Sequence, residues 1–427
     1  MSSSNIRAGL AAAEPLDDPG QTVTAPGTRR LLGALALDFT ALYAAYGGVP
    51  GVLLADLVSR ADPGGRSTAF GVIATVGAVS TLLANPIAGA LSDRTRSRYG
   101  RRSPWMAGGA LLGGLSLIAL GTGLDLLWIG VVWALVQFTL GTLQAALTAV
   151  IPDRAPVERR GLFSSASGLA SMGGATFGTA LAAGFAHALG LGFAVFGLLV
   201  IAATAVFLLL DREESSLAAA VEPLRVGAFL RGFWISPRRH PDFAWAFLGR
   251  FLLMLGYFGV SSYQLYILED YLGMSADRAN HLVPLLSLTM LPALLVSAAV
   301  GGPLSDRIGR RKPIVVLATL GMGAALAIPL AVPSEGGMFA YSVLSGLSCG
   351  AYEVVDLALM TQVLPDTNGT AMGMGILNIA IAAPQALAPA MSAAAVAVFG
   401  GYRMLFAVAI ILLVAGATSI MPIRTVR

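Results

Sequence analysis

Uncharged apolar runs recur along almost the whole chain, separated by short polar segments. Each run is about 20 residues or more, which lets a helix rising 1.5 Å per residue cross about 30 Å of hydrocarbon. The predicted spans are 31–56, 68–91, 104–123, 127–151, 161–188 and 190–210, then 242–268, 280–304, 313–332, 337–364, 369–395 and 402–421. The pattern therefore predicts an all-α membrane protein with twelve transmembrane helices.

Composition supports a membrane protein over a soluble one. The chain has 427 residues, yet only 12% of them are charged and 56% are hydrophobic. Ordinary globular chains carry about 25% charged residues. The single cysteine, Cys349, excludes an intramolecular disulfide, and the three histidines do not form a cluster typical of a metal site. We expect no enzyme, because no phosphate-binding loop or sizeable soluble domain is apparent.

Five segments follow from this pattern. The predicted organisation is a disordered cytoplasmic tail (1–30), a six-helix half (31–210), a cytoplasmic linker with an interfacial helix (211–241), a second six-helix half (242–421) and a C-terminal cytoplasmic tail (422–427).

Basic residues predict the orientation of the spans. Of the 27 Lys and Arg residues, nearly all fall in the tails or in loops on one side of the twelve-span arrangement. The exceptions are Arg60, Arg66, Arg250, Arg278 and Arg403. Because cytoplasmic loops carry an excess of Lys and Arg, both termini are expected in the cytoplasm of a multi-pass protein of the inner or plasma membrane. The net charge of +4 is then explained by interaction with the anionic cytoplasmic surface of the membrane and does not require nucleic-acid binding.

Two basic loops show that the halves are repeats. The sequence GALSDRTRSRYGRR begins at Gly89 and GPLSDRIGRRK ends at Lys312, and Asp93 matches Asp306, 213 residues on. The same offset relates IPD at 151–153 to LPD at 364–366. Parallel repeats of six helices around a central cavity are a known transporter architecture.

These loops are candidate cytoplasmic gates, because a carboxylate at a helix end can face an arginine or a helix N-terminus across a mobile interface. The alternative is that the outer arginines only set topology. The candidate gate residues are Gly89, Asp93, Arg94, Arg101, Arg102, Gly302, Asp306, Arg307, Arg310 and Arg311.

The pattern G-x-L-S-D-R-x-G-R-R between the second and third helices of each half resembles the signature loop of the major facilitator superfamily. The resemblance implies a secondary transporter working by alternating access, with helices one, four, seven and ten lining a central cavity. The longer first loop with Pro-Trp, and AYEVVDLALMTQVLP in the tenth helix, resemble more narrowly the glycoside–pentoside–hexuronide and sucrose–proton symporters.

Ionisable residues inside the spans are candidates for ion coupling, because charge is costly in hydrocarbon. These residues are Asp38, Arg250, Glu353 and Asp356. Asp38 and Arg250 hold near-equivalent places in the repeat, so we expect them to face each other, with Asp356 at a similar depth and Glu353 one turn away. This network would carry a proton; the alternatives are a permanent ion pair that fixes packing, or sodium coupling.

Amides and aromatic rings within the spans are candidates for binding a polar, uncharged solute. For any one of them the alternative role is a contact between helices. The candidates are Tyr43, Tyr46, Trp133, Gln137, Gln144, Tyr263, Gln264, Tyr266, Tyr352, Asn378 and Gln385.

The sequence thus predicts a proton-coupled symporter of a sugar or glycoside that acts as a monomer in the bilayer, with no cofactor beyond the ion gradient. A proton-driven exporter of drugs or metabolites from the same superfamily is the main alternative. Such exporters often have a glycine-rich, proline-containing pattern in helix five, and this chain has the glycines without the proline. A membrane sensor that binds without transport is the second.

Overall fold

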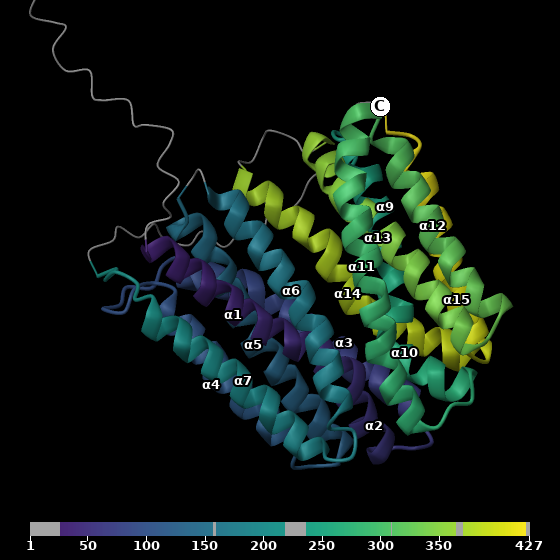
Figure 1. Cartoon of the computed structure of the whole chain (residues 1–427), viewed down its shortest axis with the longest axis horizontal. Helices are drawn as coiled ribbons and strands as arrows, with labels where there is room; N and C mark the ends of the chain where they lie inside the picture. Colours follow the sequence, from purple (N-terminus) through teal and green to yellow (C-terminus); the bar gives the residue numbers. More distant parts are fainter. Residues whose placement is uncertain (1–25, 157–158, 218–235, 309, 364–369, 424–427) are drawn as a thin grey trace, which may run out of the picture.

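Long helices run back and forth across the molecule in two adjacent bundles (Figure 1). The computed structural model describes residues 26–423, apart from 157–158, 218–235, 309 and 364–369. The first bundle contains α1 (Pro26–Gly48), the π-helical turn η1 (Val49–Leu54), α2 (Ala55–Ala61), α3 (Arg66–Ser92), α4 (Ser103–Leu120), α5 (Leu126–Arg154), α6 (Arg160–Ala183) and α7 (Leu189–Leu210). The second contains α9 (Pro241–Ser262), α10 (Gln264–Tyr266), the π-helical turn η3 (Ile267–Tyr271), α11 (Ala276–Ile308), α12 (Lys312–Ala331), α13 (Glu335–Val363), α14 (Thr370–Phe399) and α15 (Tyr402–Ile420).

The all-α fold with twelve long helices in two halves is confirmed. Within the described residues, eleven helices are long and apolar enough to cross a membrane. The remaining long helix, α6, is rich in Ser and Gly and is therefore less apolar. Most ends agree with the predicted spans to within a few residues; α6 ends earlier, at Ala183. Most of the predicted N-terminal tail and interfacial helix lies outside the described residues.

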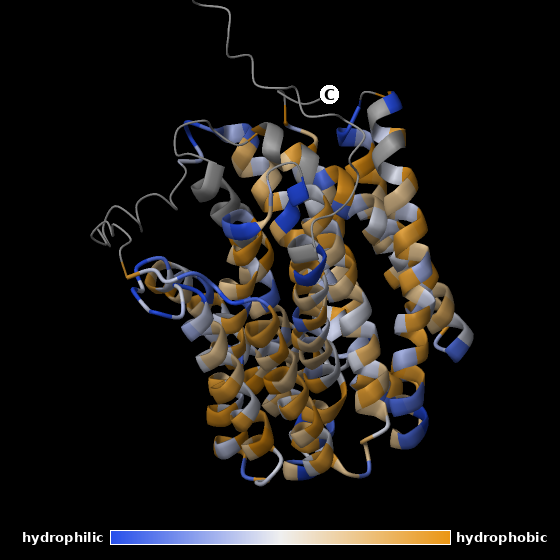
Figure 2. Cartoon of the chain, turned by 60° about the vertical axis from the view of Figure 1, so that its left-hand side comes forward, coloured by the Kyte–Doolittle hydropathy of each residue, from blue (hydrophilic) through white to orange (hydrophobic). Residues whose placement is uncertain are grey.

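The outer faces of the helices are apolar. On α3, Val72, Val76, Val79 and Leu83 are all exposed, and their spacing places them on one helix face. Hydrophilic residues gather mainly toward the two ends of the bundle, as Figure 2 shows. Such a surface suits hydrocarbon around the middle and water at both ends.

The two halves meet through α3 against α14 and α6 against α11. These pairs are the second and eleventh, and the fifth and eighth, of the twelve long helices, as two related halves require. Within the halves, glycines allow helices to pack closely. A Cβ at Gly174 would lie 2.5 Å from the Thr40 carbonyl oxygen, and one at Gly346 would lie 2.5 Å from that of Met290.

The two ends of the bundle differ in chemistry. At one end α1 begins, α15 ends, and the two repeated basic loops follow α3 and α11; we call this the basic end. At the opposite end lie α2, α10 and η3. The π-helical turns η1 and η3 interrupt the first long helix of each half there, so this end is also built on the repeat.

Candidate functional site

A buried ion pair joins α9 to α13. A guanidinium nitrogen of Arg250 lies 2.8 Å from a carboxylate oxygen of Asp356, and the two residues are 3% and 2% exposed. Sequence reasoning expected these two residues to be neighbours, and the structure brings them together. A pair removed from water in this way is strongly interdependent, because loss of either partner leaves a buried charge.

Two further polar residues of α13 flank the ion pair. Glu353 is partly buried and interacts electrostatically with both Arg250 and Asp356. Tyr352 is fully buried, and its hydroxyl interacts with the Asp356 carboxylate. We call Arg250, Tyr352, Glu353 and Asp356 the α9–α13 cluster. The Tyr352 hydroxyl and the Glu353 carboxylate could accept or pass on a proton.

Asp38 is not part of this cluster, so the expectation that it faces Arg250 is wrong. It is fully buried in the other half, where one carboxylate oxygen accepts a 2.8 Å hydrogen bond from the Thr204 hydroxyl of α7. Its other oxygen has no partner among the described residues. Because α1 packs between α6 and α7, the face of α1 that carries Asp38 turns toward its own half.

Three of the proposed solute-binding residues form a hydrogen-bonded group between α1 and α5. The Gln144 amide nitrogen donates to the Tyr43 hydroxyl at 3.0 Å, and the Tyr46 hydroxyl donates to the Gln144 amide oxygen at 3.3 Å. The two tyrosine rings meet edge to face, with centroids 5.7 Å apart. All three residues are only partly buried, so they can offer polar and aromatic surface to a ligand.

The other candidates are dispersed. Trp133 and Gln137 lie between α5 and α3, next to Gly77. Tyr263 and Tyr266 are buried at the opposite end. Gln264, which lies between them in the sequence, is partly buried. Gln385 is exposed on α14, whereas the surroundings of the Asn378 side chain lie outside the described structure.

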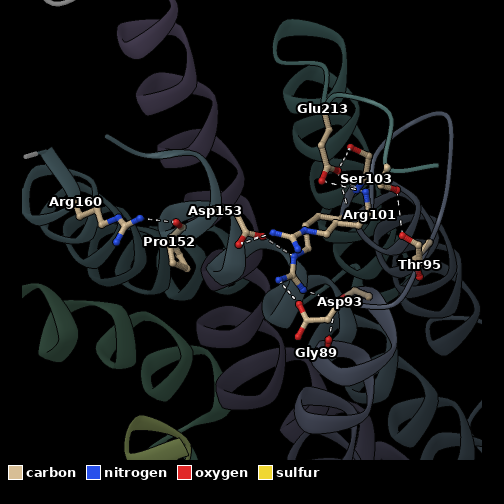
Figure 3. Close-up of polar contacts among 12 residues, drawn as sticks. Gly89, Asp93, Thr95, Arg101, Ser103, Pro152, Asp153, Arg160 and Glu213 are labelled. Carbon is tan, nitrogen blue, oxygen red and sulfur yellow. Dashed lines mark hydrogen bonds and ion pairs between the residues drawn. The ribbon is translucent and has the colours of Figure 1, made fainter. Parts of the chain in front are cut away.

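The first basic loop forms an ion-pair network at the basic end (Figure 3). Arg102 is 2.5 Å from Asp93 and 2.9 Å from Asp153, and Arg101 is 2.9 Å from Asp153. Arg102 also donates to the Ser92 hydroxyl at 2.6 Å. The network holds the ends of α3, α4 and α5 together. The charges of this loop therefore stabilise the packing of three helices, in addition to any effect on membrane topology.

Glycine at position 89 is not needed for close packing in this conformation. A Cβ at Gly89 would meet no described atom within 4 Å. Its carbonyl accepts hydrogen bonds from the Asp93 backbone and from the Ser92 hydroxyl, both at 3.1 Å. Arg94 likewise bonds within its own helix, to the Ala90 carbonyl.

Glu213, which sequence reasoning missed, anchors this loop. Its carboxylate accepts hydrogen bonds from the backbone amides of Arg101, Arg102 and Ser103 at 2.9–3.0 Å, and from the Ser103 hydroxyl at 3.0 Å. These amides form the start of α4, where unpaired N–H groups favour an anion. The segment that follows α7 therefore holds the α3–α4 loop in place. The only sequence signal was an acidic residue just beyond a span.

We expect Glu213→Gln to lower the stability of the detergent-solubilised protein by about 2 kcal/mol, since hydrogen bonds to a charged acceptor are worth about 1.5–3 kcal/mol. A thermal unfolding curve would measure this as a lower Tm. Glu214→Gln is the matched control, because Glu214 is adjacent and exposed. Equal Tm values for the two variants would contradict the anchoring role.

The second basic loop is anchored in a related way. The Lys312 ammonium, at the start of α12, donates to the Met421 carbonyl and, at 3.1 Å, to that of Ile423, just beyond α15. Arg307 and Arg310 are exposed, and Arg311 is partly buried. The side-chain surroundings of Gly302 and Asp306 lie outside the described structure.

Polar and aromatic contacts between the halves gather at the opposite end. The Tyr263 hydroxyl donates to the Ser67 carbonyl at 2.7 Å, and the Tyr266 hydroxyl to that of Ala55 at 3.0 Å. The Phe70 ring lies edge-on to both tyrosines, with centroids 5.5 and 5.3 Å apart. The bundle is therefore held closed at this end.

Gly71 permits this closure. A Cβ there would lie 2.6 Å from the Tyr263 hydroxyl and 2.9 Å from the Pro389 carbonyl oxygen. We expect Gly71→Ala to force the halves apart at this end, lengthening the distance between spin labels on the exposed residues Pro63 and Ser275. Gly33→Ala, where a Cβ meets no described atom within 4 Å, is the control. An unchanged distance in Gly71→Ala would show that the interface adjusts without opening.

The described structure is that of a two-repeat membrane protein, with a buried ion pair between membrane helices and an ion-paired loop at one end. The family profile of the Major Facilitator Superfamily matches residues 31–299 and 246–426, and the chain belongs to that family.

Relatives and solved structures agree with this assignment. The chain is 30% identical to the MFS transporter asaE of Aspergillus flavus over 131 residues, and 51% identical to the uncharacterized symporter sll1374 of Synechocystis over 41 residues. These matches span 31% and 10% of this chain, and only 28% and 8% of those proteins. Inward-facing crystal structures of a bacterial homologue of the human lysosomal transporter Spinster align over 94% of this chain and 96% of that one. Their TM-scores are 0.68 occupied and 0.62 unoccupied, at 16% identity, which shows a shared fold.

Proposed function

We propose that this protein is a proton-coupled symporter that moves a neutral polar solute, a sugar or glycoside, across the cell membrane by alternating access. The observation that carries the proposal is the Arg250–Asp356 ion pair, because a buried carboxylate that can lose its charge is the chemical requirement for carrying a proton.

The proton step follows from the geometry of the α9–α13 cluster. Protonation of Asp356 removes the negative charge that Arg250 faces at 2.8 Å, so the attraction between α9 and α13 weakens. Deprotonation restores it. A change in the position of α9 against α13 can thus be linked to proton binding. Glu353 and the Tyr352 hydroxyl are neighbouring groups that could bind or pass on the proton.

By the positive-inside rule we assign the basic end to the cytoplasm and the opposite end to the outside, and we call the latter the outer end. Three of the basic residues that break the rule have acidic or carbonyl partners at that end. Arg66 pairs with Glu269, Arg278 pairs with Glu335, and Arg60 donates to the Ala186 carbonyl. The outer end is closed in this conformation, so solute would be exchanged with the cytoplasm.

A neutral, hydroxyl-rich solute fits the group formed by Tyr43, Tyr46 and Gln144. This group offers amide and phenol hydrogen-bonding groups beside aromatic faces, and it carries no formal charge. The short match to a relative named a symporter supports coupled movement in one direction.

Uptake into proteoliposomes tests the proposal. Labelled sucrose, maltose and related glycosides would be supplied under an imposed inward proton gradient, with and without a protonophore. We expect at least one sugar to accumulate only when the gradient is present. Proton-driven efflux of a hydrophobic dye without any sugar flux would instead support the exporter, and binding without flux would support the sensor.

A further inference from the structure

An ionic contact between the halves closes the outer end, and it involves two adjacent acidic residues of η3. Arg66, at the start of α3, is 2.6 Å from Glu269 and also pairs with Asp270. The Tyr402 hydroxyl donates to Asp270 at 2.6 Å, and the Arg66 guanidinium lies over the Tyr266 ring, 5.4 Å from its centroid. We call Arg66, Glu269, Asp270 and Tyr402 the outer latch.

A cavity of about 180 Å³, lined mainly by charged and polar residues, lies beside the outer latch and is bounded by both halves. Asp56 of α2 and Asn280 of α11 meet across it, with the Asn280 amide nitrogen 3.1 Å from an Asp56 oxygen. The Asn280 side-chain oxygen is buried there with no hydrogen-bond partner among the described residues. Asn280 is only 4% exposed. The cavity volume and this unpartnered oxygen indicate a site that is large enough and has the polar groups to hold water.

Negative charge exceeds positive charge around this cavity. The charged and titratable groups that face Glu269 or the cavity are Asp56, Arg60, Arg66, His187, Tyr266, Asp270 and Asp277. Arg66 is shared between two carboxylates, Arg60 donates to the Ala186 carbonyl, and His187 is 3.4 Å from Asp277.

Two of these carboxylates are both buried and related by the repeat. Asp56 is 8% exposed, the Glu269 side chain is 8% exposed, and they stand 213 residues apart, which is the offset that relates the two halves. They also interact electrostatically. Closing the outer end thus brings together two like charges that would each be hydrated in an open outer end. Like charges held together in a poorly hydrated site favour the binding of one proton.

We infer that Glu269 is a second proton site, separate from the α9–α13 cluster, which is filled from the outside as the outer end closes. Arg66 then keeps Asp270 as its ionised partner, and Glu269 stays at the interface as a neutral acid. The inference rests on the proposed alternating access, since it requires an outer end that opens.

The sign of the pH dependence follows from linkage. Burial raises the pKa of the Glu269 carboxyl above its ordinary value, and Arg66 offsets this in part. Protons favour the conformation in which the pKa is higher, which is the closed one. External acid should therefore stabilise the closed outer end, and this stabilisation is lost as the pH rises through the raised pKa.

Cysteine accessibility can test this without transport. Ser67→Cys, in a Cys349→Ser background, places a thiol where the hydroxyl oxygen of Ser67 is buried at the interface between the halves. Right-side-out vesicles would be labelled from outside with a neutral, impermeant maleimide–polyethylene glycol. The same cysteine in a Glu269→Gln background is the reference at each pH, so changes in thiol ionisation cancel.

We expect the parent to label on the order of 5-fold faster than the Glu269→Gln reference at about pH 8, and the two rates to converge at about pH 5. Asp270→Asn is the matched control: it should speed labelling at every pH while keeping the pH dependence. A parent-to-reference ratio that does not change with pH would overturn the inference. Labelling needs neither solute nor gradient, so this failure would be distinct from a failure of sugar uptake.

Discussion

Asp356→Asn is expected to abolish accumulation of solute against its gradient while leaving exchange of labelled for unlabelled solute. The amide keeps the size of the side chain but cannot bind and release a proton, and it removes the charge that lies 2.8 Å from Arg250. Driven uptake should fall by roughly 100-fold or more, the scale of losing a proton-transfer group. Parallel measurements of driven uptake and exchange in the same proteoliposomes would separate coupling from binding.

Asp38→Asn is the control for this prediction, since Asp38 is also a buried carboxylate but pairs with Thr204 in the other half. It should lower stability and retain gradient-driven accumulation. Loss of coupling in Asp38→Asn together with normal coupling in Asp356→Asn would move the proton site to α1.

Arg250→Met is expected to have the largest effect on stability. The substitution leaves Asp356 buried and unpaired, and breaking one side of a buried ion pair costs about 3–5 kcal/mol. The expected result is a strongly lowered Tm or a loss of folded protein in detergent.

The double variant Arg250→Met, Asp356→Leu shows whether charge is the cause. Replacing both partners with apolar side chains removes the unpaired charge, so the Tm should recover toward that of the parent while driven uptake stays absent. If the double variant is no more stable than Arg250→Met, the loss lies in the packing of the Arg250 side chain and not in the unpaired carboxylate.

Much of the fold could be predicted because it depends on length and hydropathy. Uncharged runs of about 20 residues indicate membrane helices whatever their neighbours are, and the offset of 213 residues revealed the repeat. The approach of Arg250 to Asp356 was also foreseeable, since buried charges need partners.

What could not be predicted depends on which face of a helix turns toward which neighbour. Asp38 and Arg250 are at similar places in the repeat, but α1 presents Asp38 to α7. Glu213 was missed because its role depends on a loop approaching the start of α4. Asp56 and Glu269 carried a signal that was not used: both are acidic and they are related by the repeat offset.

The central claim is that solute and proton move together, and the most direct measurement is proton flux driven by solute. Reconstituted protein would be given a downhill gradient of a transported sugar with no imposed pH difference, and the external pH would be followed with an electrode. We predict alkalinisation of the medium that begins with sugar addition, disappears with a protonophore and is absent in Asp356→Asn. Sugar entry with no change in external pH, in a protein that still transports, would contradict proton coupling.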